Sequence, residues 1–98
     1  MSDFTQSVLD VLHRLKPGEV ASYGEIAEEA GFPGAARAVG NLLATTDGLP
    51  WWRVIRSDGT LAATKPDEQA RRLIGEGLRV ENGRVRSDRR PTPLRRSG

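Results

Sequence analysis

The sequence contains no cysteine among its 98 residues, and it contains a single histidine, His13. The absence of cysteine excludes disulfides, thiolate metal sites and a cysteine nucleophile. One histidine is too few for an ordinary zinc site, so we expect neither a metal nor a cofactor. No apolar run approaches the roughly 20 residues that span a bilayer, and the first residues lack the basic and apolar stretches of a signal peptide. We therefore expect a cytoplasmic protein that does not enter membranes.

Net positive charge is small and is concentrated at the end of the chain. The whole sequence has a net charge of +2, whereas residues 87–98 hold four arginines against one aspartate. Residues 1–86 are therefore slightly acidic overall, and any nucleic-acid site on them must be a local patch. We predict one folded domain over residues 1–86. The remainder is predicted to be a disordered basic tail, which either stays solvated or adds non-specific phosphate contacts.

Three helices are indicated in the first half of the chain. Apolar residues at helical spacing predict a helix over residues 3–15, which a Pro-Gly pair ends. Ser22 and Glu25 fit a capping box at the start of a second helix of about two turns. A turn at residues 31–33 separates it from a third helix, expected over residues 34–44. Two short helices joined by a tight glycine-containing turn make a helix-turn-helix.

The second half of the chain mixes loop, helix and strand. Residues 46–50 are expected to form a loop, with a short extended segment at 53–56. Pro66 suits the first turn of a helix that reaches about Gly77. The residues expected on the buried side of this helix are Ala70, Leu73 and Ile74. Asn-Gly at 82–83 predicts a terminal hairpin, so the whole pattern predicts an α-rich α+β fold, a winged-helix-like domain with a helix-turn-helix and a short C-terminal hairpin.

Three short motifs suggest a family. Residues 50–55 read Pro-Trp-Trp-Arg-Val-Ile, Tyr23 is followed by glycine, and residues 35–37 read Ala-Ala-Arg. In this order and near this spacing, the motifs resemble the O6-alkylguanine-DNA alkyltransferase family over residues 4–77. That family carries Pro-Cys-His-Arg-Val-Ile, in which the cysteine accepts the alkyl group and the histidine helps to form the thiolate. With Trp51 in the cysteine's place, the chain most resembles the alkyltransferase-like proteins, which bind alkylated guanine in DNA without transferring the alkyl group.

The small residues around Arg37 are the first candidate DNA contacts. A helix is about 10–12 Å across and the minor groove is about 6 Å wide, so only a nearly bare helix face fits a widened groove. Ala35, Ala36 and Gly40 provide such a face. The resemblance implies that Arg37 enters the base stack in place of the damaged nucleotide, and that Tyr23 presses on the neighbouring phosphate. Residue types alone also allow alanines packed on another helix, a solvated Arg37 and a half-buried core tyrosine.

The resemblance places a lesion pocket at Pro50, Trp51, Trp52, Arg53 and Val54. Indole has no ionisable group near neutral pH and is no nucleophile, but it offers a flat apolar surface and one N–H donor to a flipped guanine. The alternative is a core Trp51 in a protein without lesion preference. Trp52 replaces the family's histidine; it either packs inward and braces the loop, which we favour, or shapes the pocket.

Three further features bear on the pocket. Glu76 matches a glutamate of the family's active-site network, although its cysteine and histidine partners are absent. Asn41 lies in the expected third helix and is interpreted as structural. Residues 59–66 lack the tyrosine of the family's binding loop and form a shorter segment, which predicts an open pocket that accepts bulky O6-alkyl groups.

The residues and the resemblance together predict a monomeric, non-enzymatic sensor of O6-alkylguanine in double-stranded DNA. It would bind from the minor groove, flip the damaged base and recruit nucleotide-excision repair proteins, a partner implied by the resemblance alone. The competing hypothesis is a transcriptional helix-turn-helix module that reads a sequence in the major groove and has no lesion preference. A third class, an enzyme of another activity, lacks a nucleophile–base pair in the sequence.

Overall fold

The computed structural model describes residues 3–62 and 65–86. The elements in chain order are α1 (Asp3–His13), β1 (Ala21–Ser22), α2 (Tyr23–Glu29), α3 (Ala36–Thr45), the 3-10 turn η1 (Trp51–Arg53), β2 (Val54–Ile55), α4 (Pro66–Gly75), β3 (Arg79–Glu81) and β4 (Arg84–Arg86). The prediction of a helix-rich α+β domain with a helix-turn-helix and a C-terminal hairpin is confirmed. The predicted basic tail, residues 87–98, lies outside the described residues.

Local signals account for the ends of several elements. Ser22 caps α2: its hydroxyl accepts a hydrogen bond from the Glu25 N–H at 3.0 Å, and the Glu25 carboxylate accepts from the Ser22 N–H at 2.9 Å. This reciprocal pair is the predicted capping box. In the β3–β4 hairpin, Asn82 and Gly83 have φ values of 53° and 72°. Both central residues therefore adopt the left-handed conformation that a tight hairpin turn requires.

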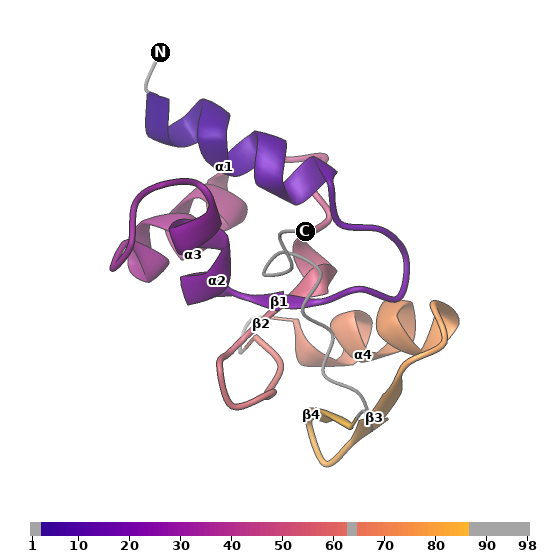
Figure 1. Ribbon diagram of the computed structural model, residues 1–98. Coiled ribbons are helices and arrows are strands. Elements are labelled where there is room, and N and C mark those ends of the chain that lie inside the picture. The colour runs from indigo at the N-terminus through magenta and orange to yellow at the C-terminus, as the bar shows by residue number, and fades with distance from the viewer. Residues whose placement is uncertain (1–2, 63–64, 87–98) are drawn as a thin grey trace.

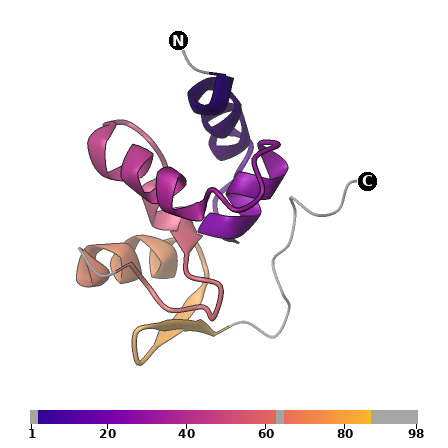
Figure 2. The ribbon, with the colours of Figure 1, turned by 90° about the vertical axis from the view of Figure 1, so that its left-hand side faces the viewer.

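A short parallel pairing of β1 with β2 joins two parts of the molecule (Figure 1). Ala21 pairs with Val54 and Ser22 with Ile55. On one side of this pair lie α1, α2 and α3, and on the other lie α4 and the hairpin (Figure 2). The pairing places the start of α2 directly beside the η1–β2 segment, so two motifs that are far apart in the sequence become neighbours.

The described residues form one buried apolar cluster on each side of the β1–β2 pair. The first packs α1 against the helix-turn-helix and is built from residues such as Val8, Leu12, Ile26 and Val39. The second lies under α4 and consists of Val20, Ile55, Leu61 and Leu73. Full burial of a side chain of this size contributes about 1.5–3 kcal/mol. The two clusters fix the helices on either side of the strand pair.

The buried side of α4 differs from the sequence prediction. Ile74 is 55% exposed, whereas Gln69 is fully buried and Leu73 lies one turn after it. The Gln69 amide N–H groups donate to the carbonyl oxygens of Trp52 at 3.1 Å and Val54 at 2.9 Å, and its oxygen accepts from the Ala62 N–H at 2.8 Å. Because these bonds satisfy a buried polar group, glutamine can lie on the buried side of α4, and Ile74, which was expected there, is exposed instead.

Other departures are small. The first helix ends at His13 rather than residue 15, and Arg53, expected to begin the extended segment 53–56, instead ends the 3-10 turn Trp51–Arg53. Among the helices of residues 3–62 and 65–86, none is long and apolar enough to cross a membrane.

Candidate nucleic-acid interface

A cleft of about 1150 Å³ opens between α3, the η1 turn and the segment that follows β2. Its lining residues are Tyr23, Ala36, Arg37, Gly40, Asn41, Leu43, Ala44, Thr46, Asp47, Gly48, Trp51, Arg56, Ala62 and Lys65. The structure thus brings together five of the predicted site residues, which are Tyr23, Ala36, Arg37, Gly40 and Trp51. Ala35 is not on the cleft wall; it is the residue that precedes the first turn of α3.

Half of the α3 residues that line the cleft have small side chains. Ala36, Gly40 and Ala44 line it at helical spacing, and Arg37 is the charged side chain that α3 adds. Arg37 is exposed. A helix face of this kind allows close approach of another surface, with a single cation projecting from it.

Tyr23 lies against α3 where Gly40 leaves room for its ring. A Cβ atom added at Gly40 would stand 3.6 Å from Cε2 of Tyr23. Burial raises the pKa of the Tyr23 hydroxyl, and the positive charge of Arg56 opposes this only in part. The hydroxyl is therefore protonated at neutral pH, and it can donate a hydrogen bond to an anionic oxygen at the rim of the cleft.

Trp51, the first residue of η1, lines the same cleft as Tyr23. Its ring meets that of Trp52 edge-to-face, with 6.2 Å between centroids and an interplanar angle of 89°. The Lys65 ammonium lies 5.7 Å from the Trp51 ring centroid. Trp51 is half-buried, so part of the indole surface is accessible from the cleft.

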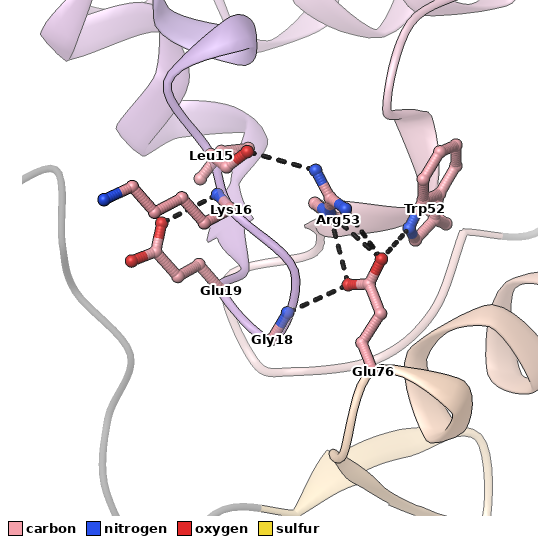
Figure 3. Close-up of polar contacts among 7 residues, drawn as sticks. All are labelled: Leu15, Lys16, Gly18, Glu19, Trp52, Arg53 and Glu76. Carbon is pink, nitrogen blue, oxygen red and sulfur yellow. Dashed lines mark hydrogen bonds and ion pairs between the residues drawn. The ribbon is translucent and has the colours of Figure 1, made fainter.

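Four N–H groups converge on the Glu76 carboxylate, just after α4 (Figure 3). Trp52 Nε1 donates to Oε2 at 2.9 Å, and the Gly18 N–H donates to Oε1 at 3.0 Å. Arg53 contributes Nε to Oε1 at 3.1 Å and Nη2 to Oε2 at 2.8 Å, and its Nη1 donates to the Leu15 carbonyl oxygen at 3.0 Å. One carboxylate therefore ties the segment after α1 to the η1 turn.

These contacts determine the protonation of Glu76. Burial alone raises the pKa of the carboxyl group, but the hydrogen bonds from Arg53, Gly18 and Trp52 and the charge of Arg53 outweigh it and lower the pKa to about 2. Gly18 suits this place because its φ is +89° and an added Cβ would lie 3.3 Å from the Glu76 carbonyl oxygen. Glu76 is thus an ionised structural anchor at neutral pH.

Four residues of the predicted pocket lie away from the cleft wall. Trp52 and Arg53 are directed to Glu76, and the Arg72 guanidinium also lies 4.5 Å from the Trp52 ring centroid. Val54 is fully buried in the core, and Pro50 is buried as well. Trp52 therefore packs inward, which is the orientation that the sequence analysis favoured. Arg53 supports the loop through its bonds to Glu76 and to the Leu15 carbonyl oxygen.

Sequence reasoning missed several residues that form or hold the cleft. Arg56 and Lys65 supply two of its cations, and Asn41 lines it although it was interpreted as structural. Asn41 follows Arg37 by four residues, a spacing that predicts the same helix face. Gln69 supports the η1–β2 segment through its hydrogen bonds to the Trp52 and Val54 carbonyl oxygens. No local sequence signal distinguishes this glutamine from one on the surface.

No group of three or more metal-ligating side chains occurs in the part of the chain that the structure describes. The cleft combines a phenol, an indole, an arginine on a bare helix face and two further cations. Residues 3–78 match the family described as "6-O-methylguanine DNA methyltransferase, DNA binding domain". The chain belongs to this family. The resemblance drawn from the three sequence motifs is thereby confirmed.

Relatives within the family carry names that refer to base flipping or to alkyltransferases, and one similar structure contains damaged DNA. A "DNA base-flipping protein" of Vibrio parahaemolyticus is 41% identical over 91 residues, covering 87% of this chain and 91% of that protein. "Alkyltransferase-like protein 1" of Schizosaccharomyces pombe is 36% identical over 87 residues, covering 82% and 81% of the two chains. The structure of S. pombe Atl1 with damaged DNA containing O6-carboxymethylguanine is similar with a TM-score of 0.79 and 32% identity, over 90% of this chain and 91% of that one.

Proposed function

We propose that this protein is a non-enzymatic sensor of O6-alkylguanine in double-stranded DNA. The observation that carries the proposal is the cleft, which joins Tyr23, Arg37 and Trp51 and contains no cysteine. The names of the Vibrio and S. pombe relatives, and the damaged DNA in the Atl1 complex, support a lesion-binding role. The chain shares the family of the methyltransferases and lacks the thiol on which their reaction depends.

In this proposal α3 enters the minor groove. Ala36, Gly40 and Ala44 allow the helix to approach the groove floor, and the exposed Arg37 fills the gap that a flipped nucleotide leaves in the base stack. The protonated Tyr23 hydroxyl donates to the phosphate beside the lesion. The major-groove alternative would favour α3 side chains that reach base edges, and small residues on this wall are poorly suited to that contact.

The flipped guanine would lie against Trp51 in the open cleft. An indole offers stacking area and no leaving-group chemistry, so the expected outcome is binding without turnover. Because the cleft is open, we expect similar affinity for O6-methylguanine and for larger adducts; a steep loss of affinity with adduct size would contradict this. The bound complex would act by recruiting nucleotide-excision repair proteins, as a monomer on each lesion.

The deciding experiment compares two duplexes that differ only in one O6-methylguanine in place of guanine. Binding is measured by anisotropy of a dye on the DNA at fixed salt, and tryptophan fluorescence is followed in the same titration. Tighter binding to the lesion with quenching that Trp51→Phe removes would support base entry beside Trp51. Equal affinity for both duplexes would favour the transcriptional alternative. Recruitment is tested separately, by asking whether the protein increases incision of the lesion duplex by purified excision-repair proteins.

A further inference from the structure

The β3–β4 hairpin carries three arginines on one face. Val80 pairs with Val85, and both valines pack against the apolar cluster under α4. Successive side chains of a strand point to opposite faces, so the residues that flank the two valines share the other face. These exposed residues are Arg79, Glu81, Arg84 and Arg86. The three arginines among them are termed the arginine face of the hairpin.

The arginine face concentrates positive charge on a domain that is otherwise acidic. Residues 1–78 contain eight basic and eleven acidic residues, whereas residues 79–86 contain three basic residues and one acidic residue. A nucleic-acid contact on a domain of this composition has to be a local basic patch. The hairpin is such a patch, and the proposed binding mode does not use it.

The strand register places like charges opposite each other. Arg79 pairs directly with Arg86, and like charges in such a cross-strand pair repel. Glu81 partly offsets the repulsion, because its carboxylate oxygens lie 3.2 Å from Arg79 Nη2 and 4.0 Å from Arg86 Nε. One negative charge is thus shared between two guanidinium groups. A phosphate that approached this face would relieve the remaining repulsion.

The turn that follows β2 joins the hairpin to the cleft. Arg56 lines the cleft, and its N–H donates to the Thr60 carbonyl oxygen at 3.0 Å. Thr60 forms a β-bridge with Arg84, and the Val85 N–H donates to the Gly59 carbonyl oxygen at 2.9 Å. A Cβ atom added at Gly59 would stand 3.3 Å from Cγ of Arg84. The stem of Arg84 therefore lies on the same hydrogen-bonded turn that brings Arg56 to the cleft.

Resting on the proposed function, we propose that the arginine face is a second DNA contact, which binds backbone phosphates on one side of the lesion. A duplex bound at the cleft continues beyond it, and the hairpin adjoins the cleft through the turn after β2. Guanidinium groups suit this contact because they bind phosphate oxygens through paired N–H donors. Phosphate contacts carry no direct sequence information. The hairpin should therefore add the same affinity for damaged and for undamaged DNA.

The size of the protein limits where these phosphates lie. The structure extends 37 Å along its longest axis, and the phosphates of one strand follow each other at about 3.4 Å along the helix axis. The contacted phosphates should therefore lie within about 11 base pairs of the lesion. Loss of two such contacts should lower the slope of log affinity against log salt by about 1–2, and it should weaken binding roughly three- to tenfold at about 0.1 M salt.

The test uses the full chain and two duplexes, one with guanine and one with O6-methylguanine, titrated at several salt concentrations. The double variant Arg84→Gln, Arg86→Gln removes two charges of the arginine face, and Arg84→Lys, Arg86→Lys retains them. The double variant Arg14→Gln, Lys16→Gln is the matched control, because both residues are exposed and lie outside the hairpin and the described cleft wall. Circular dichroism verifies that each variant is folded.

Glu81→Gln tests the same contact in the opposite direction. It removes the carboxylate that partly neutralises two arginines, so binding to both duplexes should become about two- to fivefold tighter. Loss of a residue that only supported the hairpin would not tighten binding. Asp10→Asn is the control for the gain of one positive charge, because Asp10 is exposed on α1, which lies at the end of the molecule away from the hairpin (Figures 1 and 2).

The double glutamine variant on the hairpin should weaken binding to both duplexes by the same factor and reduce the salt slope, whereas the double lysine variant should bind nearly as the unmodified protein does. Shortening the duplex on one side of the lesion, and not on the other, should remove this difference. Unchanged affinity and slope would overturn the inference and assign the arginine face to an anionic partner other than DNA. An equal loss in the control pair would also overturn it, because overall charge would then govern binding.

The proposed function and the hairpin contact fail in different ways. If the unmodified protein bound both duplexes with equal affinity, lesion recognition would be refuted, and the arginine variants would still decide whether the hairpin contacts DNA. If lesion preference were present and the hairpin variants bound as the unmodified protein does, only the hairpin contact would be refuted.

Discussion

Replacing Glu76 by glutamine would leave four converging N–H groups without the negative charge that now accepts them. Glutamine keeps one acceptor oxygen and presents an NH₂ group where the other oxygen was, so at least one donor from Arg53 or Trp52 would face another donor. The side chains of Arg53 and Glu76 are only 13% and 14% exposed. Water therefore replaces the lost bonds poorly.

The expected cost at neutral pH is about 2–4 kcal/mol of unfolding free energy. Hydrogen bonds to charged groups contribute about 1.5–3 kcal/mol each, and loss of one partner of a buried pair costs about 3–5 kcal/mol, with the lower part of this range suited to residual exposure. A domain of this size has only about 5–15 kcal/mol of stability. The melting temperature should therefore fall by about 10–20 °C.

The same carboxylate predicts a dependence of stability on pH. The folded-state pKa of Glu76 is about 2, below the ordinary value of 4.5. The unfolded chain therefore binds the proton more readily between these values, and the stabilisation is complete above pH 4.5 and is lost as the pH falls towards 2. The contribution amounts to at most about 3 kcal/mol. Glu76→Gln should remove this part of the acid dependence.

The measurement is urea unfolding followed by far-ultraviolet circular dichroism, at neutral pH and in steps down to pH 2. Glu68→Gln is the matched control, because Glu68 lies on α4, the helix that precedes Glu76, in an exposed ion pair with Arg72, and its loss should cost less than about 0.5 kcal/mol. If Glu76→Gln cost no more than Glu68→Gln, or kept the acid dependence of the unmodified protein, the structural role assigned to Glu76 would be refuted.

Three further predictions concern the cleft and its support. Arg37→Ala should weaken binding to an O6-methylguanine duplex about tenfold or more while the melting temperature stays nearly constant, because Arg37 is exposed; a comparable loss of thermal stability would contradict this. Gln69→Leu should cost about 3–5 kcal/mol in urea unfolding because it orphans two carbonyl oxygens and one N–H, whereas exposed Gln6→Leu should be nearly neutral. Trp51→Cys should not acquire methyl groups from labelled O6-methylguanine DNA, and label on the protein would refute that expectation.

Signals that act within a few residues were sufficient to predict most of the helices. The Ser22–Glu25 capping box, Pro66 at the first turn of α4 and Asn82-Gly83 in the hairpin each describe a local conformation that the structure contains. These features depend on backbone geometry and short-range hydrogen bonds. For that reason they can be predicted from the sequence without knowledge of the residues that pack around them.

Contacts between distant parts of the chain could not be predicted from such local signals. The β1–β2 pair has two residues in each strand, too few for a periodic pattern, and its partners are separated by the whole helix-turn-helix. In α4 the inward positions include Gln69, Leu73 and, just beyond the helix, Glu76, so two polar residues lie inward on an element whose buried side was expected to be apolar. Their partners are backbone carbonyls and an arginine from distant segments, which no pattern within α4 reveals.

In the candidate site, too, residues within local motifs were predicted and residues brought in by long-range contacts were not. Tyr23, Arg37 and Trp51 were predicted because three sequence motifs carry them, and the structure brings all three to one cleft. Arg56 and Lys65 belong to irregular segments without a motif, so their approach to Tyr23 and Trp51 emerges only from the fold. Trp52, Arg53 and Val54 adjoin Trp51 in sequence, but the η1 turn and β2 direct them to the interior.

The Glu76 contacts bear both on proton transfer and on the stability of the fold. The resemblance assigns the matching glutamate to an active-site network that includes cysteine and histidine. In this chain its pKa of about 2 leaves it unable to accept a proton near neutral pH. Indole is a hydrogen-bond donor only, so Trp52 holds the carboxylate at 2.9 Å and exchanges no proton with it. The ionised carboxylate instead fixes the η1 turn through Trp52 and Arg53, and Trp51, the first residue of that turn, lies on the cleft wall.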